Sequence, residues 1–387
     1  MNKFLKTIAV LAAVMMAFTA LTACGEKADE PTTTDDKSQT QPADNADNNN
    51  DDSGEQTDSA AVVPSLTING ESIDISDNPV ILTVGGIDIN FDEYRYMYKY
   101  YQSYYAQYYG ITGDLWEGNE ENFKVFKDSV KADLIEQNFG NIVAKKYGLT
   151  LDDEDMKKVD EYMDEERAQF ESEEAFQEAL AASGIKEELL RKLITSSVMS
   201  EKVYNELYVG ENAKLKQSDD EIRQNLKKNY VRVIHLLITN EHFQSTEGYE
   251  EADDEALRAA AKTFAEEKLA EIKAGADLYE LAQTVGDDPG MQENPNGYLF
   301  TYNQMVPEFE EASFALKVDE VSGLVESDYG YHIIKRLEQD NYIEEHFDEV
   351  KEQYINDYFN LEVDKILADA EIVYSDYYDG ISYDSIA

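Results

Sequence analysis

The spacing of hydrophobic positions changes along the chain, and each change predicts a different kind of element. Short apolar runs typical of strands occupy residues 66–68, 80–84 and 87–89. Apolar residues then recur every three or four positions, which is the helical period. The helices expected from this period span residues 90–108, 122–147, 152–182 and 186–208. We therefore expect a mostly helical domain over residues 64–228.

The pattern becomes mixed after residue 229. Strands are expected at residues 231–238, 297–301, 321–325 and 331–336, and helices at 254–274, 278–285 and 307–314. The order β-α-α-β-α-β-β predicts an α+β domain over residues 229–339. One further amphipathic helix is expected at residues 343–370, and a lone helix of this kind must pack on another apolar surface. We expect residues 340–387 to return to the helical domain, so that the α+β domain is inserted into a split helical one.

The N-terminus has the pattern of a targeting segment. Lys3 and Lys6 precede an apolar run at residues 8–20, which is short for a membrane span. The following Leu-Thr-Ala-Cys resembles a bacterial lipobox, which implies cleavage of a signal peptide of residues 1–23 and lipidation of Cys24. An ordinary signal peptide beside a chance cysteine is the alternative. Under the lipobox interpretation, the acyl chains hold the protein on the extracytoplasmic face of the cell membrane.

Residues 24–63 are rich in Asp, Asn, Thr, Gln and Ser and have little apolar content. Such a segment buries too little surface to offset its ordering entropy, so we expect a disordered acidic tether.

Charge and residue counts exclude several classes of function. The formal net charge of −49 argues against binding to nucleic acid and against a basic patch for anionic lipid. A single cysteine cannot form an intrachain disulfide, and four histidines leave few ways to build a metal site. No metal and no cofactor is predicted.

Tyrosine is unusually frequent, with 27 in the chain, and many lie on the helix expected at residues 90–108. Packing in the core is one interpretation of this stripe. The other is a surface that grips extended polypeptide, because Tyr offers apolar area and a polar tip at little cost in rotamer entropy.

The α+β stretch resembles the parvulin-type peptidyl-prolyl cis–trans isomerases. It has the family's His followed by apolar residues at 235–237 and a Gln-Met-x-x-x-Phe element at 304–309. Residues 311–316 and 321–325 continue the match, and residues 330–334 resemble the closing Gly-x-His-Ile-Ile strand. The layout of the whole chain is similar to that of the PrsA-type foldase lipoproteins. The resemblance implies an antiparallel parvulin-like sheet domain inserted in a split, SurA/PrsA-like helical chaperone domain.

The resemblance also implies the residues of the site. Met305 and Phe309, four residues apart on one helix face, are expected to bind the proline ring with Phe300 and Gln304. The paired histidines His235 and His332 are expected to orient Asp288 by hydrogen bonds, with Ser327 in the same network. Asp288 would act on the amide electrostatically, or donate a hydrogen bond if protonated. Two departures from the family pattern are Tyr329, where a small hydroxyl residue is common, and the segment Gly297-Tyr298-Leu299.

The loop after the first strand of this domain bears on the choice of substrate. Residues 239–256 contain seven acids and no Lys or Arg, so a phosphorylated substrate would be repelled. The expected partners are unfolded or translocating secreted polypeptides with X–Pro bonds.

Two other classes of function compete with this interpretation. A non-catalytic holdase would keep the parvulin-like domain as a degenerate binding module. A solute-binding lipoprotein would need two α/β lobes, for which the sequence has no pattern. The sequence leaves open whether the chain forms a homodimer.

Overall fold

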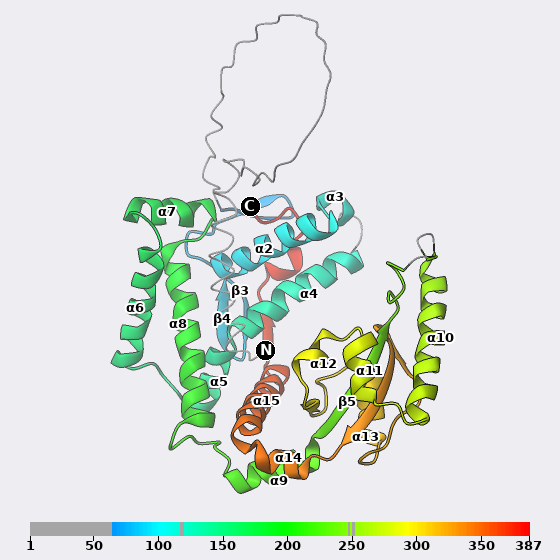
Figure 1. Cartoon of the computed structure of the whole chain (residues 1–387). Helices are drawn as coiled ribbons and strands as arrows, with labels where there is room; N and C mark the ends of the chain where they lie inside the picture. The colour runs from blue at the N-terminus through cyan, green and yellow to red at the C-terminus, as the bar shows by residue number, and fades with distance from the viewer. Residues whose placement is uncertain (1–63, 117–119, 247, 250–251) are drawn as a thin grey trace, which may run out of the picture. The chain divides into compact units, whose positions relative to one another are not determined.

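The computed structural model describes residues 64–116, 120–246, 248–249 and 252–387 (Figure 1). The expected signal peptide, the Cys24 lipidation site and the acidic tether lie outside the described residues. The described residues divide into two compact units, the first consisting of those up to Lys214 together with Tyr358–Ala387, and the second of those in Leu215–Asp357. The predicted α+β class, with an antiparallel-sheet domain inserted in a split and mostly helical one, is confirmed.

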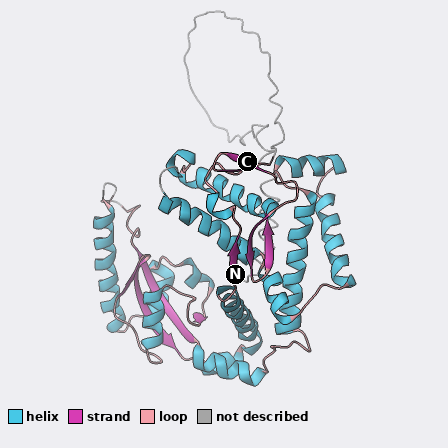
Figure 2. Ribbon diagram, turned by 180° about the vertical axis from the view of Figure 1, so that it is seen from behind, coloured by secondary structure: helices cyan, strands magenta, loops and turns pink. Residues whose placement is uncertain are grey.

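The strands of the first unit form two small antiparallel sheets, drawn in magenta in Figure 2. Strands β1 (Leu66–Ile68) and β2 (Glu71–Ile73) make one hairpin, and β3 (Val80–Val84) and β4 (Ile87–Asn90) make another. Both hairpins turn through two residues of positive φ, Asn69-Gly70 and Gly85-Gly86. Tight turns of this kind favour Asn and Gly, because other residues are strained at positive φ. Strand β9 (Ile372–Tyr374), from the far end of the chain, pairs with β3 and completes the order β4-β3-β9.

Helices make up the rest of the first unit. They are α2 (Phe91–Tyr109), α3 (Gly113–Trp116), α4 (Glu120–Gln137), α5 (Phe139–Tyr147), α6 (Asp153–Ala168), α7 (Glu173–Ala182) and α8 (Glu187–Tyr204). A π-helical turn, η2 (Asn205–Val209), follows α8, and a 3₁₀ turn, η3 (Tyr378–Gly380), lies near the C-terminus. Val159, Phe176 and Leu190 belong to a buried cluster that joins α6, α7 and α8.

The structure corrects two of the expected helices, each of which is broken in two. The stretch 152–182 forms α6 and α7 because Ser172 accepts a hydrogen bond from the amide of Ala175 and starts a new helix. The stretch 122–147 forms α4 and α5, with Asn138 between them. The buried side chain of Asn138 donates to the buried carboxylate of Glu93 on α2 over 2.6 Å, which fixes the break.

Helices α5 and α8 approach very closely at Gly140. A Cβ atom at this position would lie 2.7 Å from the Cα atom of Ser200. Only glycine fits this contact, and the closeness lets α5 pack along the middle of α8.

The second unit is the α+β one. Its helices are α9 (Asp219–Asn229), α10 (Asp254–Lys273), α11 (Leu278–Val285), α12 (Pro289–Glu293), α13 (Pro307–Ala315) and α14 (Asp340–Glu345). Its strands are β5 (Val231–Thr239), β6 (Tyr298–Phe300), β7 (Val325–Ser327) and β8 (Gly330–Leu337). All pairs are antiparallel, in the order β6-β5-β8-β7. The strand expected at 321–325 is wrong, because Val321 makes only an isolated bridge to Lys335 and the paired strand begins at Val325.

The two faces of this sheet pack on different helices. Alternate residues of β5 and β8, among them Leu236 and Ile333, pack against the small residues Ala261 and Ala265 of α10 and against α11. The opposite face carries Val233 and Ile334 and packs against α13. Because side chains alternate across a strand, the two histidines of β5 and β8 fall on this second face.

Helix α15 (Phe347–Ala368) contributes residues to both units. Tyr354, in the second unit, donates a hydrogen bond from its hydroxyl to Gln217 over 2.7 Å. Phe359, in the first unit, is fully buried and packs edge-on against Phe139 and Tyr208. In the part of the chain that the structure describes, no helix combines the length and the apolar content needed to cross a membrane.

Candidate active site

Two buried histidines lie side by side on the face of the second sheet that α13 covers. His235 of β5 pairs with Ile334, and His332 of β8 pairs with Leu237, so the histidines are diagonal neighbours. Their rings are 5.5 Å apart and nearly parallel, at 26°. Their Nδ1 atoms are 3.4 Å apart. The predicted pair is therefore brought together by strand register alone.

Asp288 lies at one end of a chain of hydrogen-bonded side chains that includes the two histidines. It lies between α11 and α12, where its Oδ1 atom accepts a hydrogen bond from the amide of Gly290 at the start of α12. Its Oδ2 atom lies 2.7 Å from Nε2 of His235 and 2.7 Å from the hydroxyl of Tyr298. A Cβ atom on Gly290 would lie 2.1 Å from the Tyr298 hydroxyl, so glycine at this position admits the tyrosine.

These contacts keep Asp288 ionised. Its partial burial alone would raise the pKa of the carboxyl. The hydrogen bonds from His235 and Tyr298, the further electrostatic attraction of His235 and the hydrogen bond from the amide of Gly290 outweigh burial and lower the pKa of Asp288 to about 2. Burial is the largest cause that raises the pKa of the Tyr298 hydroxyl, followed by its hydrogen bond to Asp288 and the negative charge of that carboxylate. The hydroxyl therefore stays protonated and donates. Of the two roles expected for Asp288, the electrostatic one fits this state and the protonated donor does not.

His332 and Ser327 form the other end of this chain of hydrogen-bonded side chains. Nε2 of His332 lies 2.8 Å from the Ser327 hydroxyl, and the amide of Tyr329 donates to that hydroxyl oxygen over 3.2 Å. Burial first, and then the neighbouring His235, lower the pKa of His332 to about 4, so the ring is neutral at neutral pH.

The hydrogen-bond network assigns the ring protons. The ionised Asp288 requires a proton on Nε2 of His235. His332 then donates from Nδ1 to Nδ1 of His235, and its Nε2 accepts from Ser327. In this arrangement each polar hydrogen of the chain from Ser327 to Asp288 has an acceptor.

An apolar wall lies against the histidines. The ring of Phe309 on α13 is 4.9 Å from that of His235 and 5.3 Å from that of His332, and Phe300 of β6 is 5.9 Å from Phe309. Phe300 and Phe309 are almost completely buried. The expectation that Met305 and Phe309 share one helix face is wrong, because α13 begins only at Pro307; Met305 precedes the helix, packs on the same cluster and stays partly exposed. Gln304 is exposed, and its side-chain oxygen accepts a hydrogen bond from the amide of Thr301. This hydrogen bond shapes the turn before α13.

The structure thus gathers most of the predicted site residues into one network and gives their partners. His235, Asp288, His332 and Ser327 are linked by hydrogen bonds, and Phe300, Met305 and Phe309 form one apolar cluster. Gln304 stands apart from both groups. Their roles in catalysis stay predictions.

Sequence reasoning missed Tyr298 as a member of the site. The segment around it was noticed only as a departure from the family spacing, and that departure was the available signal. It also missed Asp287, whose carboxylate accepts hydrogen bonds from the amide and hydroxyl of Thr239 and lies 2.8 Å from Nδ1 of His242. The amide of Asp287 donates to the carbonyl of Leu237. These contacts tie the segment that carries Asp288 to the strand that carries His235.

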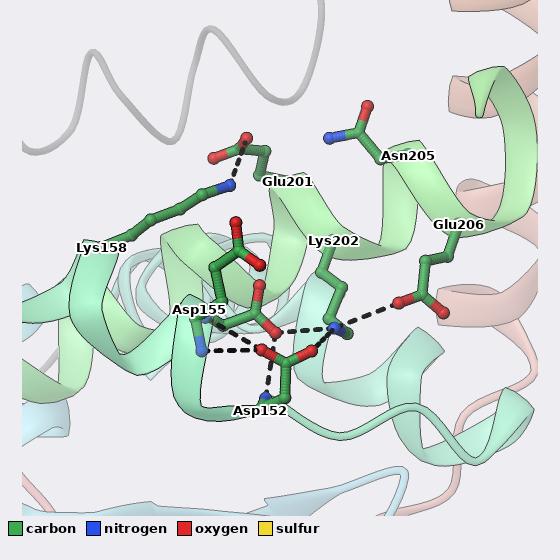
Figure 3. A pocket seen from close by; sticks show the side chains of 8 residues that line it. Asp152, Asp155, Lys158, Glu201, Lys202, Asn205 and Glu206 are labelled. Atoms are coloured by element: carbon green, nitrogen blue, oxygen red, sulfur yellow. Dashed lines mark hydrogen bonds and ion pairs between the residues drawn. The ribbon is translucent and has the colours of Figure 1, made fainter. Parts of the chain in front are cut away.

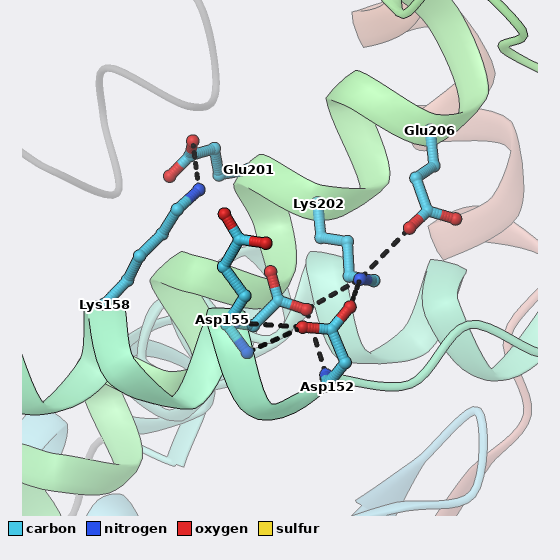
Figure 4. A network of polar contacts seen from close by, with 7 residues as sticks. Asp152, Asp155, Lys158, Glu201, Lys202 and Glu206 are labelled. Carbon is cyan, nitrogen blue, oxygen red and sulfur yellow. Dashed lines mark hydrogen bonds and ion pairs between the residues drawn. The ribbon is translucent and has the colours of Figure 1, made fainter.

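A polar cavity of about 240 Å³ in the first unit is a competing candidate site (Figure 3). Lys202 of α8 donates to Asp155 over 2.6 Å and to Asp152 over 3.0 Å, and it pairs with Glu206 (Figure 4). The hydrogen bond from Lys202, with the amides at the start of α6, lowers the pKa of Asp152 to about 2. The charges of this cluster satisfy one another and join α6 to α8, which is a structural role. Over the described ranges, no group of His, Cys, Asp and Glu residues is arranged to hold a metal ion.

Comparison with known proteins places the two units in known families. Residues 215–340 match the family model of the PPIC-type PPIASE domain, and residues 60–204 match that of a SurA-like N-terminal domain. The chain is 29% identical over 278 residues to the foldase protein PrsA of Caldanaerobacter subterraneus subsp. tengcongensis, covering 70% of this chain and 76% of that protein. It is 30% identical over 237 residues to the foldase protein PrsA of Geobacillus kaustophilus, covering 61% of this chain and 69% of that protein.

The chain belongs to the PrsA foldase family. The resemblance to parvulins and to PrsA foldases predicted from the sequence is confirmed, and the chain is a peptidyl-prolyl cis–trans isomerase. Membership of the PrsA family supports a foldase function. A solved structure of PrsA from Bacillus anthracis covers 61% of this chain and 94% of its own at 20% identity, with a TM-score of 0.33, and adds nothing to this assignment.

The PrsA assignment sets the chemistry that the site must perform. Rotation about an X–Pro amide bond has a barrier of about 18–20 kcal/mol, and no bond has to break. The site therefore needs no nucleophile, metal or cofactor in its reaction. It offers an apolar surface for a proline ring and, beside it, a fixed negative charge on Asp288.

Proposed function

We propose that this chain is a lipid-anchored, extracytoplasmic prolyl isomerase and foldase that acts on unfolded secreted polypeptides without requiring phosphate. The observation that carries the isomerase mechanism is the ionised Asp288, held by His235 and Tyr298, with the apolar cluster of Phe309 and the partly exposed Met305 against the His235 ring. The proline ring lies on the apolar cluster, and the preceding carbonyl oxygen faces Asp288. A negative charge there raises the energy of the charge-separated resonance form that keeps the amide planar, and so favours the twisted state.

The absence of phosphate specificity is supported by charge near the site. The segment at 239–256 has seven acids and no cation in its sequence. Asp253 and Asp254 cap and begin α10 there. Arg258, one turn further on, pairs with Glu326 over 3.2 Å. A phosphoserine dianion would meet carboxylates with no cation in this segment to balance them.

Anchoring is supported by the N-terminal sequence. The lipobox-like segment ends at Cys24, and the strongly acidic composition leaves no basic patch to hold the chain on anionic lipid. Cys24→Ser should therefore move the protein from the membrane fraction to the soluble fraction of the cell extract. A variant still found in the membrane pellet after a high-salt wash would contradict the lipid anchor.

Isomerisation of proline tetrapeptides by the full chain tests the central proposal. We expect turnover of Ala-Pro and Glu-Pro peptides, loss of at least tenfold in kcat/KM in His332→Ala, and no gain when phosphoserine precedes proline. A phosphopeptide turned over faster than its unphosphorylated twin would overturn the substrate assignment. Absence of any turnover, with aggregation of an unfolded client still suppressed, would leave the non-catalytic holdase as the function.

A second assay tests the foldase part of the proposal. Refolding of a client whose slow phase is limited by proline isomerisation should be accelerated by the wild-type chain. A client without such a phase is the control, since catalysis of X–Pro rotation cannot accelerate its refolding. Equal acceleration of both clients would show that the chain assists folding by binding alone.

A further inference from the structure

Helix α2 divides into a buried half and an exposed half. Tyr94 and Tyr98 of the first half are fully buried in the first unit. In the second half, Tyr100, Tyr108 and Tyr109 are exposed to 47%, 68% and 62%. The tyrosine stripe therefore has both of the characters expected for it, core at one end and surface at the other.

The exposed half forms an ordered aromatic surface, which we call the tyrosine face and define as Tyr100, Tyr104, Tyr108 and Tyr109. Tyr100, Tyr104 and Tyr108 follow one another at the four-residue spacing that lines up side chains on a helix. The rings of Tyr100 and Tyr104 are stacked at 18° with centres 6.3 Å apart, and Tyr104 lies 5.1 Å from Tyr108.

A second row of rings supports the tyrosine face from below. Tyr101 and Tyr105 pack on Phe126 of α4, and Tyr105 also lies edge-on to Trp116 at 5.3 Å. The Tyr101 hydroxyl donates to Asp133 over 2.8 Å. Because the lower row is anchored, the tyrosine face is held in place before any partner arrives, which reduces the entropy lost on binding.

Core packing does not explain this surface. Large exposed aromatic patches are rare on soluble proteins and mark sites of interaction. Tyrosine suits such a site, because it offers a large contact area with only two side-chain torsions to fix.

Charge identifies the kind of partner. Among residues 100–123 whose side chains the structure describes, Glu120 and Glu121 are acidic and none is Lys or Arg, and the last turn of α2 has no basic side chain. The C-terminus of a helix carries partial negative charge, and the face of an aromatic ring is also negative. All of these features favour a cation, whereas a second copy of a chain with a net charge of −49 would be repelled.

We propose that the tyrosine face binds Arg- and Lys-containing segments of unfolded client polypeptides, with the cationic side chains lying on the tyrosine rings. This inference rests on the proposed foldase function and names the chemistry of the client that the first unit selects. Arginine is preferred over lysine, because its planar guanidinium stacks on rings and is more weakly hydrated.

Binding of labelled, unstructured Gly/Ser peptides to the full chain tests the inference. The peptides carry several Arg, Lys, Gln or Glu residues at the same positions, and affinity is measured by fluorescence anisotropy. We expect the order Arg, Lys, Gln, Glu. Replacement of Tyr100, Tyr104 and Tyr108 by Ser should weaken binding of the Arg peptide about tenfold, which is about 1.4 kcal/mol. Tyr162→Ser, at an exposed tyrosine on α6, is the matched control and should change nothing.

Two further triple variants separate the physical causes. Tyr→Phe at the same three positions keeps the ring faces and should keep the preference for Arg. Tyr→Leu keeps much of the apolar area but removes the rings, and should abolish the preference for the Arg peptide over the Lys peptide. Retention of the preference for Arg over Lys in the Leu variant, or equal binding of the Arg and Glu peptides by wild type, would overturn the inference.

The remaining outcomes are also decisive. If the Ser variant binds the Arg peptide normally but sediments as a smaller species than wild type, the face is a self-association surface and the proposal is wrong. Turnover of a proline tetrapeptide is measured in the same preparations and should be unchanged in all these variants. If the wild-type chain does not turn over the tetrapeptide, the proposed isomerase mechanism is wrong. If wild type turns over the tetrapeptide but binds the Arg peptide no more tightly than the other peptides, only the proposal for the tyrosine face is wrong.

Discussion

The hydroxyl of Tyr298 donates a hydrogen bond to the same Asp288 oxygen that lies 2.7 Å from Nε2 of His235. Two donors therefore converge on one carboxylate oxygen, and the amide of Gly290 holds the other. The carboxylate is fixed in direction as well as in charge, which a single histidine contact would not achieve.

Tyr298→Phe should weaken catalysis and change its pH dependence. Loss of one donor lets the pKa of Asp288 rise from about 2 toward its ordinary 3.8, so the acidic limb of kcat/KM should move to higher pH. At neutral pH the carboxylate is still ionised, and loss of its orientation should lower kcat/KM about three- to tenfold, or about 1 kcal/mol. Tyr302→Phe is the matched control, since Tyr302 is 55% exposed and stacks on Phe314. An unchanged acidic limb would show that Tyr298 does not act on Asp288.

Asp288→Asn should remove the charge and keep the shape of the side chain. Because we assign the charge a role in the twisted amide, kcat and kcat/KM should fall together, by about ten- to a thousandfold or about 1.4–4 kcal/mol. Asp328→Asn changes an exposed carboxylate of the same unit and should have little effect. Full kcat in a folded Asp288→Asn variant would leave the apolar pocket as the whole mechanism.

Met305 and Phe309 should respond differently to truncation, although both belong to one apolar cluster. Met305 is partly exposed, so Met305→Ala should raise KM with little loss of stability. Phe309 is 3% exposed and contacts both histidine rings, so Phe309→Ala should destabilise the second unit by about 3–5 kcal/mol. Thermal unfolding of each variant, beside its tetrapeptide kinetics, checks this division. Equal loss of stability in the two variants would contradict it.

Burial of His332 should make the second unit sensitive to acid. The folded pKa of about 4 lies below the ordinary 6.5, so the unfolded chain binds more protons between these values. Stability is therefore complete above pH 6.5 and is lost as pH falls toward 4, by about 2 kcal/mol between pH 7.5 and pH 5. Asp288, with its lowered pKa, adds a further loss only below pH 3.8.

Hydrogen exchange of the β5 and β8 amides at the two pH values measures this loss. His332→Asn should be less stable than wild type at pH 7.5 but should lose less stability on acidification. His346→Asn, at another histidine of the same unit, should keep the wild-type slope. A wild-type slope in His332→Asn would show that another group senses the acid.

The sequence predicted those parts of the fold whose signal is local. The strands at residues 80–84 and 87–89, the helices at 90–108 and 186–208, and the central strand at 231–238 each carry their own apolar pattern in the sequence. Strand β9 was missed because Ile372–Tyr374 is short and is extended only through its pairing with β3, almost three hundred positions earlier in the chain. Such a strand is set by tertiary contact, and no local pattern reports it.

The site shows the same limit. The motif pointed to His235, Asp288 and His332 because these residues stand at positions that resemble those of the family. Tyr298 could not be found in this way, since its hydroxyl reaches Asp288 only because Gly290 leaves room for it. The exposed end of the tyrosine stripe was likewise undecided, because helical spacing does not tell which half of a helix is covered.

The pairing of β9 with β3 has a consequence for the order in which the chain becomes structured as it is synthesised and leaves the ribosome. All residues of the second unit, which contains the candidate active site, have emerged once Asp357 is outside. The first unit then still lacks Tyr358–Ala387, and with them the third strand of its sheet. The second unit can thus fold while the first unit is still incomplete. A stop after residue 357 would yield a competent enzyme fused to an incomplete scaffold, and protease resistance of stalled chains of increasing length would reveal the two steps in that order.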